Sequence, residues 1–75
     1  MTDDVDRFVG SRLRERRLIL NKTIEELAES LPFTIDEIAA FESGNERIGS
    51  ANLHALSQLL KVKITYFFDG LSYEG

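Results

Sequence analysis

Two capping motifs placed eleven residues apart are the feature that most restricts how this 75-residue chain can fold. Thr23-x-x-Glu26 and Thr34-x-x-Glu37 both have the spacing of a capping box, in which a Thr hydroxyl and a Glu carboxylate satisfy backbone donors at the start of a helix. Pro32 lies between the motifs and ends the first helix. The segment of about 23–43 is therefore expected to form two short helices joined by a tight turn, a helix-turn-helix arrangement.

Apolar residues recur at helical spacing before this motif as well. Val9, Leu13 and Leu20 fall on one stripe of a helix expected over about residues 4–20. Asn21 follows, and Asn tolerates the left-handed conformation in which many helices end. Gly44 is the expected end of the second helix of the motif for the same reason.

The C-terminal part of the chain is expected to add two more helices. Ser50 is the expected cap of the first one, and Thr65 begins a short, aromatic-rich last helix that Gly70 closes. The apolar stripe of the longer helix consists of Leu53, Leu56, Leu59 and Leu60. We therefore predict an all-α fold, a compact five-helix bundle in which residues 1–75 form a single domain.

Composition excludes several classes of function. The chain has no Cys, so disulfides, thiolate zinc sites and cysteine nucleophiles are excluded. It has one His, His54, which leaves most other metal sites without a second His ligand and argues against most Ser-His catalytic arrangements. We expect no metal, no cofactor and no enzymatic activity. No apolar run approaches the ~20 residues of a membrane span, and the N-terminus is acidic where a signal peptide would be basic. We expect a cytoplasmic protein, associated with the nucleoid if it binds DNA, with no membrane partner.

The charge is unevenly distributed along the chain. Residues 1–22 contain six basic and four acidic residues, whereas residues 23–60 contain one basic residue, Arg47, and seven acidic ones. The net charge of the whole chain is -4. A protein that binds nucleic acid through bulk positive charge would not have this distribution, so any such binding must use a local patch.

A series of short motifs, in a characteristic order, covers most of the chain. They are Gly10-Ser11-Arg12-Leu13, Arg17, Thr23-x-x-Glu26-Leu27-Ala28, Ile38, Glu42-x-Gly44, Arg47-Ile48, Leu53-x-x-Leu56 and the closing segment 62–70. Together this set resembles the phage repressor/Cro-type (XRE-like) helix-turn-helix domain over about residues 9–70. The resemblance implies a lambda-repressor-like bundle, in which the second helix of the motif enters the DNA major groove and many members bind two half-sites as dimers.

One ion pair is expected inside the bundle. Arg17 lies four residues after Leu13 on the apolar stripe of the first helix, and Glu42 lies about 40° from Ile38 on a helical wheel, so both side chains point inward. The family that the chain resembles pairs an Arg and a Glu at these two positions. We expect Arg17 and Glu42 to form a structural ion pair, because leaving either charge buried alone is costly.

The face of the second motif helix opposite Ile38 is the expected base-reading surface. Base-reading helices usually present long polar side chains, which pair with base edges, whereas this face offers one carboxylate, methyl groups and hydroxyls. A carboxylate can accept from cytosine N4, and Ala can contact a thymine methyl group, so base reading is not forbidden, but this surface is poorly equipped for it. The expected base-facing residues are Thr34, Ile35, Asp36, Ala39, Ala40 and Ser43.

Other polar residues are candidates for phosphate contacts. Ile24 stands where the family favours Gln, and Pro32 stands where it favours Gly, so both positions depart from the family pattern. The basic cluster in the first helix could equally be a solvated helix face. The expected phosphate-contacting residues are Arg12, Arg16, Lys22, Thr23, Asn45, Arg47, Ser50 and Asn52.

Two interpretations of function follow. The first is a small DNA-binding transcriptional regulator that binds duplex DNA as a homodimer. The two copies are expected to contact each other through the segment 62–75, where the expected interface residues are Tyr66, Phe67, Leu71 and Tyr73. The alternative is a degenerate helix-turn-helix fold that serves as a protein–protein interaction module and contacts its partner with the acidic 25–46 surface.

Overall fold

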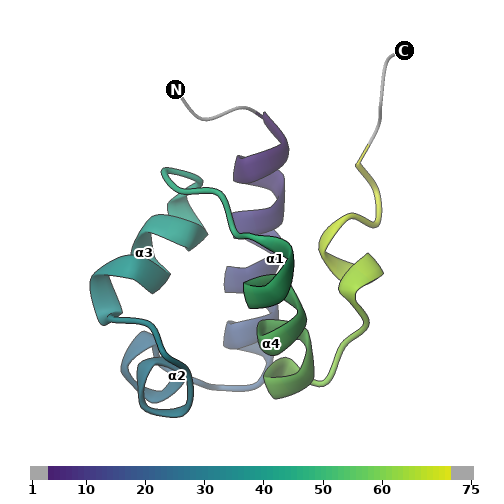
Figure 1. Cartoon of the computed structure of the whole chain (residues 1–75). Coiled ribbons are helices and arrows are strands. Elements are labelled where there is room, and N and C mark those ends of the chain that lie inside the picture. Colours follow the sequence, from purple (N-terminus) through teal and green to yellow (C-terminus); the bar gives the residue numbers. More distant parts are fainter. Residues whose placement is uncertain (1–3, 72–75) are drawn as a thin grey trace.

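The computed structural model describes residues 4–71 and is helical, as predicted. The elements are α1 (Asp4–Ile19), α2 (Ile24–Ser30), α3 (Ile35–Ser43), α4 (Ser50–Leu60) and a short 3₁₀ helix, η1 (Ile64–Phe67). Helix α1 runs through the middle of the molecule, with α2 and α3 on one side and η1 on the other (Figure 1). The prediction of five helices is therefore wrong in detail, because only four of these elements are α-helices.

Both capping boxes are present. The Thr23 hydroxyl accepts from the Glu26 amide at 3.1 Å, and the Glu26 carboxylate accepts from the Thr23 amide at 2.8 Å. Thr34 and Glu37 form the same pair of hydrogen bonds at 3.1 and 2.9 Å. The pKa of the Glu26 carboxyl is lowered below its ordinary value, mainly by the hydrogen bond from the Thr23 amide and secondly by hydrogen bonding with the Thr23 side chain. These local bonds explain why α2 and α3 begin where the sequence indicates.

The helix ends match the sequence less uniformly. Asn21 and Gly44 adopt the left-handed conformation expected of them, with φ of 56° and 81°. The cap of α4 is Gly49, which makes no side-chain hydrogen bond, and Ser50 is the first residue of the helix rather than its cap. The last helix begins at Ile64, one residue before the predicted Thr65.

All five elements contribute to one apolar core. Helix α1 contributes Val9 and Leu13 to it and η1 contributes Phe67, so a single cluster joins the first and last elements of the described chain. The buried apolar residues are Val9, Leu13, Leu27, Ile38, Phe41, Leu53, Leu56, Leu60 and Phe67. None of the helices within residues 4–71 is long and apolar enough to cross a lipid bilayer.

Helix α3 lies unusually close to α1. A Cβ atom built on Gly10 would lie 2.1 Å from the Phe41 carbonyl oxygen and 2.8 Å from that of Glu42. Only a residue without a side chain fits between the two backbones at this point. Gly10 therefore sets the distance at which the motif helix α3 sits on the scaffold.

Candidate nucleic-acid interface

Helix α3 turns one face to the core and the other to solvent. Ile38 and Phe41 are buried on the inner face. On the outer face Asp36, Ala39 and Ser43 are exposed, as are Thr34 and Ile35 before and beside them, while Ala40 is half-buried. Ile35, which the wheel places near the core edge, is 46% exposed. The six residues expected from the sequence therefore share one surface of the molecule, with Ala40 at its margin.

Much of the polar chemistry of this surface is already engaged. The Thr34 hydroxyl caps α3, and the Ser43 hydroxyl donates to the Ala40 carbonyl at 3.1 Å. The Asp36 carboxylate makes no hydrogen bond or ion pair with any residue in the described range 4–71. The surface consequently offers one unpaired anionic acceptor among methyl groups.

A buried ion pair fixes the inner face of α3. The Arg17 guanidinium donates to both Glu42 carboxylate oxygens, at 2.6 and 3.0 Å, and also to the Lys22 carbonyl at 2.9 Å. The two side chains are only 10% and 7% exposed. The hydrogen bond that Arg17 donates to the Glu42 carboxylate raises the pKa of Arg17 above its ordinary value, so the guanidinium stays charged. Arg17 and Glu42 thus form the pair expected from the sequence, and it joins α1, the α1–α2 loop and α3.

Six of the candidate phosphate contacts lie in the α1–α2 loop, in the α3–α4 loop or in the first turn of α4. Lys22 and Thr23 precede α2, with Lys22 half-buried and Thr23 exposed. The other four follow α3 or begin α4; Asn52 is half-buried, and Asn45, Arg47 and Ser50 are exposed.

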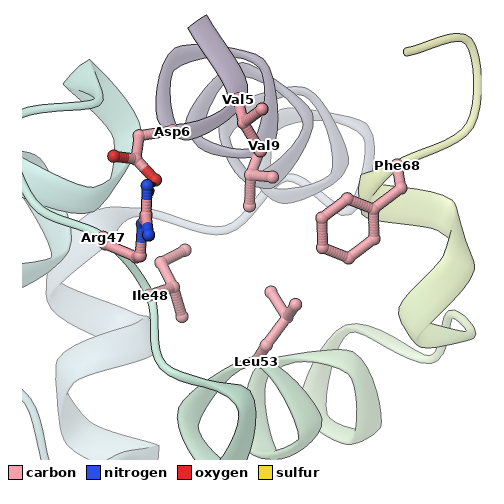
Figure 2. Close-up of a pocket in the computed structure, with 7 residues that line it drawn as sticks. All are labelled: Val5, Asp6, Val9, Arg47, Ile48, Leu53 and Phe68. Carbon is pink, nitrogen blue, oxygen red and sulfur yellow. Dashed lines mark hydrogen bonds and ion pairs between the residues drawn. The ribbon is translucent and has the colours of Figure 1, made fainter. Parts of the chain in front are cut away.

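Arg47 also borders a pocket of about 350 Å³ between the N-terminal half of α1, the α3–α4 loop and the residue after η1. Its guanidinium donates to Asp6 at 2.9 Å. Figure 2 shows this ion pair on one side of the pocket, while the other side chains shown are apolar: Val5, Val9, Ile48, Leu53 and Phe68. The pair connects α1 to the loop between α3 and α4, and no local sequence pattern predicts it.

Arg12 and Arg16 require a correction. Arg12 donates to the Tyr66 carbonyl at 3.0 Å, and its guanidinium lies 4.1 Å from the centre of the Tyr66 ring. Arg16 donates to the Leu60 carbonyl at 3.0 Å. Both side chains therefore hold the end of α4 and η1 against α1, and η1 lies on the other side of α1 from α3 (Figure 1). We remove them from the candidate interface, because the contacts that occupy them are structural.

The predicted dimer surface is only partly exposed. Phe67 is fully buried in the core, so including it among the interface residues is wrong. Tyr66 and Leu71 are half-buried, and Tyr73 lies outside the described residues. Phe68 and Ile64, which are not among the predicted interface residues, are 36% and 38% exposed. The aromatic spacing alone could not distinguish the core-facing Phe from its exposed neighbour, because a 3₁₀ turn places successive residues differently from an α-helix.

The side chains of residues 4–71 contain no cluster of His, Asp and Glu that could hold a metal ion. The pocket beside Arg47 is lined mainly by apolar groups and by one ion pair, and it includes no nucleophile.

Comparisons with known proteins agree with this geometry. Residues 10–72 match the family described as Helix-turn-helix domain. An uncharacterized HTH-type transcriptional regulator of Sinorhizobium medicae (strain WSM419) is 39% identical over 71 residues, which cover 95% of this chain and 51% of that protein. A similarly named protein of Rhizobium meliloti (strain 1021) gives the same values. An uncharacterized transcriptional regulator in the ATPase CF(0) region of Rhodospirillum rubrum is 37% identical over 67 residues, covering 89% of this chain and 62% of that protein. The chain thus spans about half the length of the first two relatives.

Proposed function

The chain belongs to the helix-turn-helix domain family, and from this premise we propose that it is a DNA-binding transcriptional regulator that inserts the outer face of α3 into the major groove. The observation that carries the proposal is the outer face itself. It is exposed along the helix, while the Arg17–Glu42 pair and Gly10 hold the inner face rigidly on α1. Rigid presentation of one helix face is what groove recognition requires. The names of the relatives as transcriptional regulators support the same proposal.

In this proposal residues of the α1–α2 loop, the α3–α4 loop and the first turn of α4 contact the phosphates. Hydroxyl and amide groups at the helix starts orient the domain, and two cations add electrostatic attraction. The proposed contacts are Lys22, Thr23, Asn45, Arg47, Ser50 and Asn52. Lys22 and Arg47 are the two cations among them, and Arg47 is already paired with Asp6. Affinity should therefore fall gently with salt, with a slope of log K against log salt of about -1 to -2 per bound domain.

Fluorescence anisotropy with labelled random-sequence duplexes at low salt tests this proposal. Ala39→Glu places a carboxylate in the centre of the outer face and should weaken binding about tenfold or more, because the new charge approaches the phosphates without a partner. Gln58→Glu changes the charge equally at an exposed position on α4 and should bind as the wild type does. No binding by the wild-type protein up to tens of micromolar would contradict the proposal, because ordinary non-specific binding is already as strong as that.

We also propose that two copies of the chain form a dimer through the segment 62–75 and that this dimer binds DNA. Phe68 and Ile64 expose apolar surface on this segment, and apolar surface favours burial between copies. Sedimentation equilibrium should detect a dimer that Phe68→Ser weakens. A protein that remains monomeric at the highest attainable concentration would exclude this part of the proposal.

The acidic surface supports a second candidate function, protein binding. Glu25, Glu29, Asp36 and Glu46 are all exposed within the 25–46 segment and would repel phosphates. If that surface only hinders DNA binding, Glu25→Lys/Glu29→Lys should strengthen binding to duplex DNA. If it binds a basic protein partner instead, the same double variant should lose the partner and still fail to bind DNA.

A further inference from the structure

The outer face of α3 presents one unpaired acceptor. Asp36 lies in the first turn of α3 and is exposed, and no described residue pairs with its carboxylate. The neighbouring Glu37 differs, because its carboxylate accepts from the Thr34 amide at 2.9 Å. Asp36 is therefore the residue on this face that is equipped to accept a hydrogen bond from a base.

Methyl groups stand beside this acceptor. Ile35 precedes Asp36 and is 46% exposed, and the exposed Ala39 lies one turn further along the same face. Residues three and four apart are neighbours on a helix surface, so Ile35, Asp36 and Ala39 form one continuous patch. A carboxylate next to apolar surface is an unusual combination on a helix that reads DNA, where amide and guanidinium groups predominate.

The base edges in the major groove match this patch to different degrees. Guanine presents two acceptors, and adenine presents an acceptor beside its amino group, so each places an acceptor against a carboxylate that has no proton to give. Thymine offers a methyl group but also the O4 acceptor. Cytosine offers the N4 amino group, which can donate to the Asp36 carboxylate, but it has no methyl group that could contact Ile35 and Ala39. A methyl group on C5 of cytosine lies beside that amino group and completes the match.

We propose that α3 recognises a cytosine through Asp36 and that methylation of this cytosine at C5 strengthens recognition through contact with Ile35 and Ala39. This inference rests on the proposed DNA binding and names the base chemistry that such binding would select. Selection against the other bases follows from the same carboxylate, because an acceptor that loses water without gaining a donor is penalised.

Selection from two randomised duplex pools tests the inference. The pools are identical except that one contains 5-methylcytosine in place of cytosine. The full chain should enrich sequences with cytosine at a fixed position. In the best sequence, changing that C·G pair to T·A should raise Kd about tenfold. Methylation of that cytosine should lower Kd about fourfold, the gain expected from burying one methyl group.

Two variants separate the contributions of the patch. Asp36→Asn should lose the cytosine preference, because an amide both donates and accepts and so suits adenine. Ile35→Ala should keep the cytosine preference and lose most of the gain from methylation. Glu29→Gln removes the same charge from an exposed position on α2 and should keep both preferences.

The outcomes distinguish the inference from the function on which it rests. If neither pool binds, the proposed DNA binding itself fails. If the pools bind but Asp36→Asn retains the wild-type base preference, DNA binding stands and recognition of cytosine by Asp36 is overturned. Equal Kd values for methylated and unmethylated sites overturn the methyl contact. An unchanged melting temperature of each variant establishes that the changes arise at the surface and not from unfolding.

Discussion

The inner and outer faces of α3 differ in how many neighbours constrain them. On the inner face, Ile38 is fully buried and Glu42 is held by Arg17. On the outer face, Asp36 and Ala39 are exposed, and the Asp36 carboxylate has no partner among the described residues. The inner face thus carries the family's architecture, while the outer face is free to change its ligand chemistry without disturbing the fold. This contrast explains how a chain can keep a helix-turn-helix scaffold and still present an uncommon set of side chains on its second motif helix.

The largest stability effect is expected from breaking the pair on the inner face. Glu42→Ala leaves the Arg17 guanidinium buried without its carboxylate and should reduce the free energy of unfolding by about 3–5 kcal/mol, measured by urea denaturation. Replacing both residues, as in Arg17→Met/Glu42→Leu, should cost less than the single change, because no charge remains buried alone. A loss below about 1 kcal/mol for Glu42→Ala would show that the pair does not hold α3 in place.

The next effect concerns the close approach of α1 and α3. Gly10→Ala should reduce the free energy of unfolding by about 1–3 kcal/mol, because the new methyl group meets the Phe41 carbonyl. Helix propensity alone predicts the opposite sign, a gain of about 1 kcal/mol. Ser11→Ala, at the next and exposed position of α1, serves as the control and should leave stability nearly unchanged. A more stable Gly10→Ala variant would mean that the two helices are further apart in solution.

A smaller effect depends on pH and concerns the start of α2. The pKa of Glu26 is lowered from its ordinary value of 4.5 in the folded protein, so its contribution to stability is fully present above that value and is lost as pH falls through the folded pKa. Glu26→Gln keeps an acceptor for the Thr23 amide but does not titrate. The difference in melting temperature between wild type and Glu26→Gln should therefore be constant from pH 8 to about pH 5.5 and shrink below about pH 4.5. A difference that persists unchanged to pH 3 would contradict this assignment.

The smallest stability effect is expected on the outer face. Asp36→Asn and Ala39→Ser should each change the free energy of unfolding by less than about 0.5 kcal/mol, since the side chains touch little. Both should nevertheless alter DNA affinity or base preference. A large loss of stability in either variant would remove the distinction between the two faces of α3.

Local chemistry explains which parts of the fold were predictable. Capping boxes act within three residues, and the inward direction of Glu42 follows from its position relative to Ile38, so both could be predicted from the sequence. The outer face of α3 followed from the same helical geometry.

Contacts between distant segments could not be predicted in this way. Arg12 reaches the carbonyl of Tyr66, 54 residues away, and Arg47 reaches Asp6, 41 residues away. Nothing in the spacing of an arginine tells whether its guanidinium will meet a carbonyl or remain in solvent. The sequence therefore suggests that the basic cluster of α1 binds phosphates, whereas Arg12 and Arg16 of this cluster donate hydrogen bonds to the C-terminal part of the chain.

The central claim is that DNA docks on the outer face of α3, and amide chemical-shift mapping of the labelled protein during titration with a selected duplex tests it most directly. We predict that the largest shifts occur at residues 34–43 and at the starts of α2 and α4, with small shifts around Arg12 and Arg16. Shifts concentrated on α1 and η1, with residues 34–43 unaffected, would contradict the account.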